Sequence, residues 1–522
     1  MPGNSLAARF VVLLVIAIWI ALHVPLLILP YYWDEAGYFI PAAYDFYTKG
    51  AIIVQSVVAE PHPPLVAVMV AIAWKAFGFS AVVARSVVLF LGAAALWGIF
   101  RLSSRVTNPQ VGLAAVLCTA LYPVFFVQSS LVHLDIAAAA FGLWALAFYF
   151  EERLASSSLM FCLAVLAKET AILIPLVLAA WELGAYVLKR RRKIGPFRSD
   201  WRRYFALAAP VIILGAWFGY YLHRTGSLYG DAEFFAFNIG PTLQPWRALA
   251  VLPMRIWHAV GYMNLFVLSF SALIAVMVSP SGILTGRFRK PVTDEGARRV
   301  YSIVGVLVAA HVLAFSLIGG AVLARYMLPV IPLVILISLS CLAQSTKHWK
   351  IAAAVSCTAF VAALFVSPTY QYDRADNLAY RKFVLQQQEG VQFVSQHYSQ
   401  GTVSTAWPAT EGFRTPYLGY LARPFSVSAM KDFSRPSLVA ARDGGADFAV
   451  LFAREQPSRI AARPGWERFG FLVSMRQRFF QSLPDLSLRD ALQVLGGRVL
   501  WSEASGGEWI AVVKLSGPTA AP

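Results

Sequence analysis

The chain has 522 residues, of which 58% are hydrophobic and only 14% are charged. Because soluble domains have about 25% charged residues, this composition excludes an ordinary soluble protein. The net charge of +17 does not indicate nucleic-acid binding, since much of it lies in short loops between apolar runs, where lysine and arginine orient membrane spans.

The first apolar run, from Phe10 to Leu29, is predicted to be a retained membrane span. It is longer than the apolar region of a typical secretory signal peptide, and no small-residue cleavage site follows it. The aromatic residues from Tyr31 to Trp33 instead indicate a membrane–water interface. Further runs of about 20 apolar residues, each long enough to cross a bilayer, recur as far as Pro368.

Five basic clusters set the predicted topology, because lysine and arginine in short loops face the cytoplasm. The clusters lie at residues 101–105, 153, 189–203, 287–299 and 347–350. All are cytoplasmic if the N-terminus is inside and the chain crosses the membrane eleven times. The predicted spans are roughly 9–30, 82–101, 110–128, 136–150, 158–168, 170–188, 203–222, 251–278, 300–318, 327–344 and 350–367.

The apolar segment from Pro63 to Phe79 is predicted to be a helix in the outer interface rather than a span. Counting it as a span would invert every later loop and place the basic clusters outside. The first outward loop is therefore expected at residues 31–81.

The composition changes at about residue 368, where mixed charges and short β-type runs appear. We expect a transmembrane catalytic domain over residues 1–367 and a small extracytoplasmic α/β domain over residues 368–522. Residues 376–398 are expected to be largely helical with a possible break at Gly390. Strands are expected near residues 446–452 and 509–515. The cysteines, at positions 118, 162, 341 and 357, have no paired spacing and suggest neither a disulfide framework nor a metal site.

The unusual polar residues gather at the predicted outward ends of the spans, where charges usually face a cavity. Asp34 directly follows the first span, and a carboxylate there can act as a general base if its pKa rises toward neutrality. Aspartate is also a preferred helix cap before Ala36, and the two roles can coexist. Glu35 would then assist Asp34.

Asp135 has the same two interpretations, because it begins an alanine-rich segment that it could cap. Lys168 lies between two apolar segments with almost no loop, so it either snorkels to the interface or binds a phosphate. Arg325 has a similar pair of interpretations, and its planar guanidinium suits phosphate.

Glu60, His62 and His258 are candidates for a divalent metal site, which would need three or four ligands. The prolines around His62 form a rigid turn in either case. No Walker A loop, dinucleotide-binding glycine motif or zinc spacing occurs. No cofactor is therefore certain, and an outward-facing enzyme would take activated groups from lipid carriers.

These residues in this order resemble the GT-C glycosyltransferases, specifically the bacterial branch related to protein O-mannosyltransferases and lipid A aminoarabinose transferases. The resemblance covers residues 8 to about 367. Its pieces are Asp34-Glu35, His62-Pro63-Pro64-Leu65, Phe77-Gly78, Arg85, Asp135, Ala167-Lys168-Glu169 and Arg325-Tyr326-Met327-Leu328-Pro329 with Pro332. The aminoarabinose transferases have Glu-Lys directly before the paired prolines, whereas this chain has Pro61-His62 and its glutamate one position earlier.

The resemblance implies a polytopic α-helical protein of the bacterial inner membrane. It would transfer a hexosyl or pentosyl group, with inversion, from a polyprenyl-phosphate carrier to an extracytoplasmic lipid, glycan or protein. Its partners would be this donor, the acceptor and membrane lipids, with no nucleic acid. By position, Asp34 would be the base and Asp135 would support the site. The donor phosphate would be bound by Lys168 and Arg325, with His62 and Tyr326.

Three alternatives stay open. A transporter or flippase of lipid-linked sugars would share the cationic cavity and need no base. An oligosaccharide ligase would use a diphosphate-linked donor. A non-catalytic receptor would use the outward domain as its binding module.

Overall fold

The computed structural model describes residues 3–192, 201–278, 295–370, 372–398, 400–454, 485–505 and 507–515. The chain divides into two compact units. Unit 1 comprises Met1–Val24 and Ala42–Val366, and unit 2 comprises Pro25–Pro41 and Ser367–Pro522. The basic clusters predicted at 189–203 and 287–299 lie partly outside the described residues.

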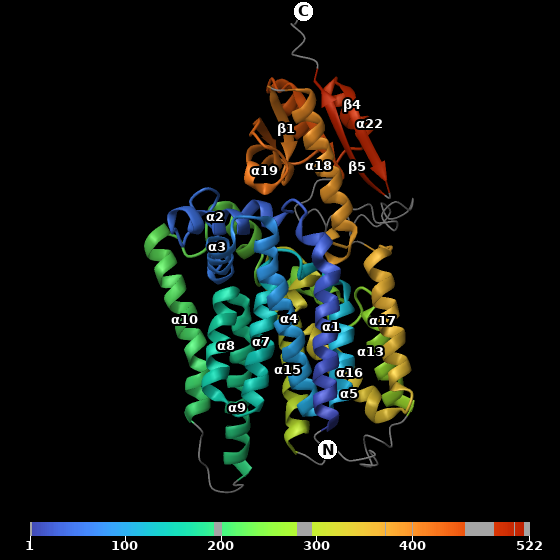
Figure 1. Ribbon diagram of the computed structural model, residues 1–522. Helices are drawn as coiled ribbons and strands as arrows, with labels where there is room; N and C mark the ends of the chain where they lie inside the picture. The colour runs from blue at the N-terminus through green and yellow to red at the C-terminus, as the bar shows by residue number, and fades with distance from the viewer. Residues whose placement is uncertain are drawn as a thin grey trace, which may run out of the picture. The chain divides into compact units, whose positions relative to one another are not determined.

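Unit 1 consists of long helices, most of which run side by side with roughly parallel axes (Figure 1). They are α1 (Gly3–Leu27), α4 (Ala81–Val106), α5 (Pro109–Leu121), α7 (Leu134–Phe150), α8 (Leu154–Ala167), α9 (Leu173–Arg192), α10 (Trp201–Thr225), α12 (Pro245–Val260), α13 (Leu265–Val278), α15 (Glu295–Leu317), α16 (Ile331–Ser345) and α17 (Trp349–Phe365). Shorter elements between them include α2 (Ile40–Lys49), α3 (Leu65–Phe77), α6 (Pro123–Gln128), η2 (Glu169–Ile172), α11 (Ala232–Phe234), η3 (Phe235–Ile239) and η4 (Ala324–Met327).

The helices have the length and surface expected of a membrane protein. Within the described ranges, five are long and apolar enough to span a bilayer: Leu6–Leu27, Ala81–Val106, Glu169–Leu188, Trp201–Thr225 and Arg298–Leu317. Six shorter apolar helices accompany them, and one further pair passes the same test together. Large apolar side chains such as Phe90 and Ile212 are about 70% exposed, as lipid-facing residues are. The membrane class is thus supported, whereas the count of eleven spans stays a prediction.

The predicted span at 251–278 contains a sharp break. Helices α12 and α13 meet at 82°. Met263 and Asn264 between them have φ angles of 46° and 65°, which lie in the left-handed region and cannot continue a right-handed helix. The Asn264 side chain donates a hydrogen bond of 2.8 Å to the Ala359 carbonyl, which holds the break in place.

The segment predicted as an interfacial helix does form a helix, α3. Its buried side, with Val66, Val70 and Trp74, packs inside unit 1. The Trp74 indole donates to the Ser80 carbonyl at 2.9 Å, and the helix ends at Gly78, whose φ of 90° suits glycine. The position of α3 relative to a bilayer stays a prediction.

Unit 2 contains the predicted α/β domain, built on a five-stranded sheet in the order β2-β1-β3-β5-β4. Strands β1 (Thr402–Ala406), β2 (Ser426–Met430) and β3 (Phe448–Phe452) are parallel, and β4 (Arg498–Ser505) and β5 (Glu508–Lys514) are antiparallel to their neighbours. The other elements are η1 (Glu35–Phe39), η5 (Arg374–Asp376), α18 (Ala379–His397), α19 (Ala409–Arg414), η6 (Pro416–Leu418), α20 (Arg435–Asp443) and α22 (Leu488–Leu495).

Helix α18 continues through Gly390, so the predicted break there is wrong. A Cβ atom at this position would lie 2.6 Å from the Cδ1 atom of Ile510 in β5. The glycine therefore allows the helix to approach the sheet closely rather than ending it.

Two of the free cysteines lie next to each other in unit 1. The Cys118 Sγ atom in α5 is 3.6 Å from the Cys357 Sγ atom in α17. The two positions are 239 residues apart in the chain, so spacing alone could not reveal their proximity.

Candidate functional site

A buried ion pair lies at the centre of the site in unit 1. Asp135 is in the first turn of α7, where the helix dipole favours a carboxylate. Lys168 immediately follows α8. Its Nζ atom is 2.6 Å from Asp135 Oδ1, and the two side chains are only 9% and 5% exposed. Neither charge could be held in such an apolar body without a partner of opposite sign.

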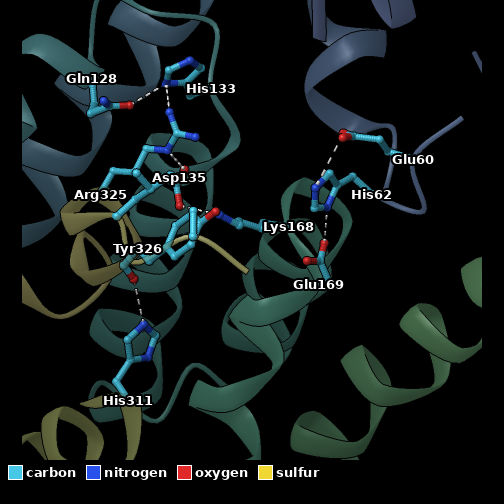
Figure 2. A network of polar contacts seen from close by, with 12 residues as sticks. Glu60, His62, Gln128, His133, Asp135, Lys168, Glu169, His311, Arg325 and Tyr326 are labelled. Atoms are coloured by element: carbon cyan, nitrogen blue, oxygen red, sulfur yellow. Dashed lines mark hydrogen bonds and ion pairs between the residues drawn. The ribbon is translucent and has the colours of Figure 1, made fainter. Parts of the chain in front are cut away.

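Arg325 and Tyr326, both in η4, complete this group (Figure 2). The Arg325 Nε atom is 3.7 Å from Asp135 Oδ2, and its NH1 group is 3.0 Å from His133 Nδ1. The Lys168 Nζ atom sits 4.1 Å from the centre of the Tyr326 ring, within the range of a cation–π contact. The residues predicted to bind phosphate at 168, 325 and 326 thus meet in space, with Asp135 between the cations.

Arg255 in α12 is a further cation that the sequence reasoning missed. Its guanidinium lies 5.5 Å from the Tyr326 ring, and it donates to the Leu323 carbonyl at 2.7 Å and the Ala321 carbonyl at 3.2 Å. It therefore fixes the turn that leads into η4. The available signal was that Arg255 is the one lysine or arginine in the predicted span at 251–278, since charges at membrane depth usually have a function.

His311 in α15 was also missed. Its Nε2 atom lies 3.2 Å from the Tyr326 carbonyl (Figure 2). The histidine is buried, and its contact with the Tyr326 backbone ties α15 to the same turn as Arg255.

His62 lies in a second polar group beside the first (Figure 2). Its Nδ1 atom is 2.9 Å from Glu169, and its Nε2 atom is 3.8 Å from Glu60. Burial alone would lower the pKa of His62, but the charges and hydrogen bond of Glu169, with the charge of Glu60, raise it to about 9. His62 is therefore protonated at neutral pH and acts as a cation between two carboxylates.

The backbone around His62 is tied to α10. The Trp217 indole donates to the Pro61 carbonyl at 2.9 Å, and the Tyr221 hydroxyl donates to the Ala59 carbonyl at 2.9 Å. These bonds hold the proline-rich turn that the sequence predicted to be rigid.

The metal candidates do not gather into one cluster. His258 lies in α12 against the ring of Tyr262, with centroids 4.8 Å apart. Within the part of the chain that the structure describes, no group of three or more His, Cys, Asp or Glu side chains could hold a metal ion. Glu60 and Glu169 instead both pair with His62, at 3.8 Å and 2.9 Å. A divalent metal stays a prediction.

Asp34 and Glu35 belong to unit 2. Asp34 occupies the position before η1, and its side chain makes no capping hydrogen bond to that helix. Glu35 is fully buried, and its Oε2 atom accepts a hydrogen bond of 2.9 Å from the Tyr32 backbone. Glu35 thus stabilises the turn that carries Asp34, whereas the predicted capping role of the Asp34 side chain is not seen.

The charges in unit 1 are unequal between the two groups. Three cations lie near the Tyr326 ring among the described residues: Lys168, Arg255 and Arg325. The carboxylate of Asp135 accompanies them. Around His62, one cation accompanies Glu60 and Glu169. The excess positive charge therefore lies on the Tyr326 side, and a buried excess of cations favours an anionic ligand.

Comparison with known proteins supports the resemblance read from the sequence. Residues 61–217 match the family model described as dolichyl-phosphate-mannose-protein mannosyltransferase. This range contains His62, Asp135 and Lys168 but neither Asp34 nor Arg325. No protein of curated function matches the chain.

The fold resembles that of two solved structures of ArnT. ArnT from Cupriavidus metallidurans in the apo state superimposes with a TM-score of 0.55 at 16% identity, covering 100% of both chains. ArnT bound to undecaprenyl phosphate gives a TM-score of 0.53 at 15% identity, covering 100% of this chain and 99% of that one. The chain therefore shares the fold of ArnT, and this agrees with the fold expected from the ordered motifs of residues 8 to about 367.

Proposed function

We propose, from its GT-C fold and its buried cation cluster, that this chain is an integral-membrane glycosyltransferase of the bacterial inner membrane. It moves one sugar from a polyprenyl-phosphate carrier to an extracytoplasmic acceptor, with inversion. The observation that carries the proposal is the excess of cations around Tyr326, with three cations to the carboxylate of Asp135 among the described residues.

The cation cluster suits a phosphate better than a neutral ligand. Lys168 and Arg325 are both oriented by Asp135, at 2.6 Å and 3.7 Å. Such preorganised donors stabilise charge that develops on a leaving phosphate and need no rearrangement during the reaction. Arg255 adds a third positive charge 5.5 Å from the centre of the Tyr326 ring. ArnT, which shares the fold, has been solved with undecaprenyl phosphate, and this supports a carrier of the same chemical class.

The proposed reaction needs one base. Asp34 would remove the proton from the acceptor hydroxyl, and the acceptor oxygen would attack the anomeric carbon of the donor sugar. The bond between that carbon and the phosphate oxygen breaks, and the carrier phosphate leaves with the electron pair. Attack opposite the leaving group inverts the anomeric centre.

The test uses the purified full-length chain in lipid nanodiscs with a panel of polyprenyl-phosphate sugars. We expect sugar release or transfer from one of them, and its loss in Asp34→Asn. Asp231→Asn is the matched control, because Asp231 also precedes a short helix, and its Oδ1 atom accepts from the Phe234 backbone at 2.8 Å, a bond that asparagine can keep. Transfer that survives in Asp34→Asn at normal protein levels overturns the base assignment. Movement of labelled lipid across a bilayer without sugar release would instead favour the flippase.

A further inference from the structure

The segment that carries Asp34 is held by the C-terminal part of the chain. Residues Pro25–Pro41 group with Ser367–Pro522 in unit 2. The Tyr31 backbone N–H donates to the Leu418 carbonyl at 3.0 Å, and the Tyr420 hydroxyl donates to the Tyr31 carbonyl at 2.9 Å. The first of these bonds is backbone to backbone, so it fixes the path of the chain just before Asp34.

The residue directly before Asp34 has an unusual backbone. Trp33 has a φ of 51°, in the left-handed region that a bulky side chain adopts only when its surroundings impose it. Besides its chain neighbour Tyr32, whose ring lies 5.8 Å away, two aromatic rings contact the Trp33 ring. The Trp407 ring lies 4.7 Å away in an edge-on arrangement, and the Phe383 ring lies 6.5 Å away. These contacts account for how the strained residue is held.

Trp407 also touches the chain beyond Asp34. A Cβ atom at Gly37 would lie 2.8 Å from Trp407 Nε1 and 3.1 Å from its Cζ2 atom, so the indole packs directly on the backbone of η1. The Tyr38 ring lies 6.1 Å from the Trp407 ring. The indole therefore contacts the segment on both sides of Asp34, at Trp33 and at Gly37.

Trp407 is itself firmly anchored. It directly follows β1, which pairs with β2 on one side and β3 on the other. A side chain at the end of an inner strand has little freedom to move, because the backbone before it is hydrogen-bonded on both edges. The sheet thus provides a rigid base for the contact.

We propose that the C-terminal α/β domain holds the Asp34 segment in its reactive conformation and that Trp407 is the positioning residue. Trp407 does not touch the reacting atoms. It fixes the backbone on both sides of the carboxylate, so the direction of that carboxylate depends on the sheet. This inference rests on the proposed role of Asp34 as the base.

The first measurement is hydrogen exchange of the full-length chain, which needs no activity. In Trp407→Ala we expect the amides of residues 33–39 to exchange at least ten times faster, while those of Phe448–Phe452 in β3 keep their protection. Trp501→Ala is the matched control in the same sheet, where the indole stacks on Phe393 at 5.8 Å. It should leave residues 33–39 unchanged. Unchanged exchange in Trp407→Ala overturns the proposal.

A second variant covers the case in which Trp407→Ala unfolds the domain. Gly37→Ala changes the same contact at its other partner, η1. The new Cβ atom would press on the Trp407 indole, and no residue of the sheet is altered. We expect faster exchange of residues 33–39 here as well, with β3 protected. If exchange in this segment does not respond, the indole contact does not hold it and the proposal fails.

The second measurement is transfer of the sugar, separated into kcat and KM for the donor. Misplacement of a reactive group by about 1 Å can cost about 100-fold, so we expect kcat of Trp407→Ala to fall roughly 10- to 100-fold with KM unchanged. Trp407→Phe should recover most of this loss. A rise in KM with kcat unchanged would contradict positioning. Exchange decides whether Trp407 holds the segment, and Asp34→Asn decides separately whether the segment carries the base.

Discussion

Each of the two units buries a group of oppositely charged side chains, and the two groups differ in their balance of positive and negative charge. In unit 2 the Arg374 guanidinium binds both oxygens of Glu508, at 2.7 Å and 2.8 Å. Its other donors reach the carbonyls of Arg454 and Ala453 at 2.7 Å and 2.6 Å. One positive and one negative charge cancel, and the donors of the guanidinium are directed at protein acceptors.

The group around Tyr326 in unit 1 is not balanced in this way. Three cations accompany Asp135 among the residues described there, and the Arg325 Nε atom is 3.7 Å from the carboxylate rather than in close contact. A balanced, fully bonded pair fixes a fold. A buried group with more cations than carboxylates favours the binding of an anion, which supplies the missing negative charge. A structural ion pair and a candidate binding site therefore differ in charge balance within the same molecule.

The largest expected effect concerns the balanced pair. Arg374→Met leaves the Glu508 carboxylate buried without its cation, and we expect a loss of about 3–5 kcal/mol in the unfolding free energy of unit 2. The unfolding of the full chain in detergent, followed by tryptophan fluorescence, measures it. Arg442→Met is the control, because Arg442 and Asp443 are 45% and 61% exposed and such pairs contribute less than about 1 kcal/mol. Equal losses in the two variants would show that the buried pair is not special.

The next effect concerns the unbalanced group. Lys168→Gln should reduce sugar transfer by about 10²- to 10³-fold, with a smaller loss of stability than Arg374→Met, because Arg325 still lies 3.7 Å from the Asp135 carboxylate. Lys49→Gln is the matched control, since Lys49 pairs with Asp45 at 3.0 Å but is 52% exposed. Titration with the polyprenyl-phosphate donor checks binding. A variant that binds and transfers normally would remove Lys168 from the phosphate site.

Replacing both members of each ion pair tests the difference between the balanced and the unbalanced group directly. Arg374→Met combined with Glu508→Leu should recover most of the stability lost by the single change, because no uncompensated charge is left in the core. Lys168→Met combined with Asp135→Leu should remain stable and yet recover no transfer. Melting curves and transfer assays on both double variants decide this. Restored transfer in the second would mean that the pair is only structural.

The smallest effect is a pH dependence at His62. The pKa of His62 is raised from 6.5 to about 9 by Glu169 and Glu60 despite burial, so the folded state binds its proton more tightly than the unfolded state does. The stability from this pair is complete below pH about 6.5 and is lost as the pH rises toward 9. The difference in melting temperature between the native chain and His62→Gln should shrink across this window. A difference that is constant with pH would contradict the pairing.

The sequence predicted the class of fold well because hydropathy and charge act locally. The positions of the apolar helices, the α/β tail and strands β3 and β5 all followed from runs of a few residues. The break after α12 did not, since it depends on Asn264 bonding to Ala359, which lies 95 residues away. Gly390 was misread for the same reason: its meaning depends on Ile510 in a distant strand.

The candidate site was likewise predictable where the signal is local and not where it depends on distant contacts. Asp135, Lys168, Arg325 and Tyr326 were recognised by their type and order, because charges in apolar segments are rare. Their meeting around one ring could not be predicted, since it depends on helix packing. Arg255 was overlooked although the same rule applied to it. Trp407 had no signal at all, because its role depends on contacts with Trp33 and Gly37 near the other end of the chain.

The hydrogen bond between Tyr420 and Tyr31 also has a consequence for synthesis of the protein. It joins residues 389 positions apart. At about 5–20 residues per second, the ribosome needs roughly 20–80 s to cover that distance. For that time the segment around Asp34 has left the ribosome without Tyr420 to hold it. We therefore expect a truncated product that ends before Trp407 to insert its helices and still lack a correctly shaped first loop, because it has none of the contacts of Trp407, Leu418 and Tyr420 with this segment.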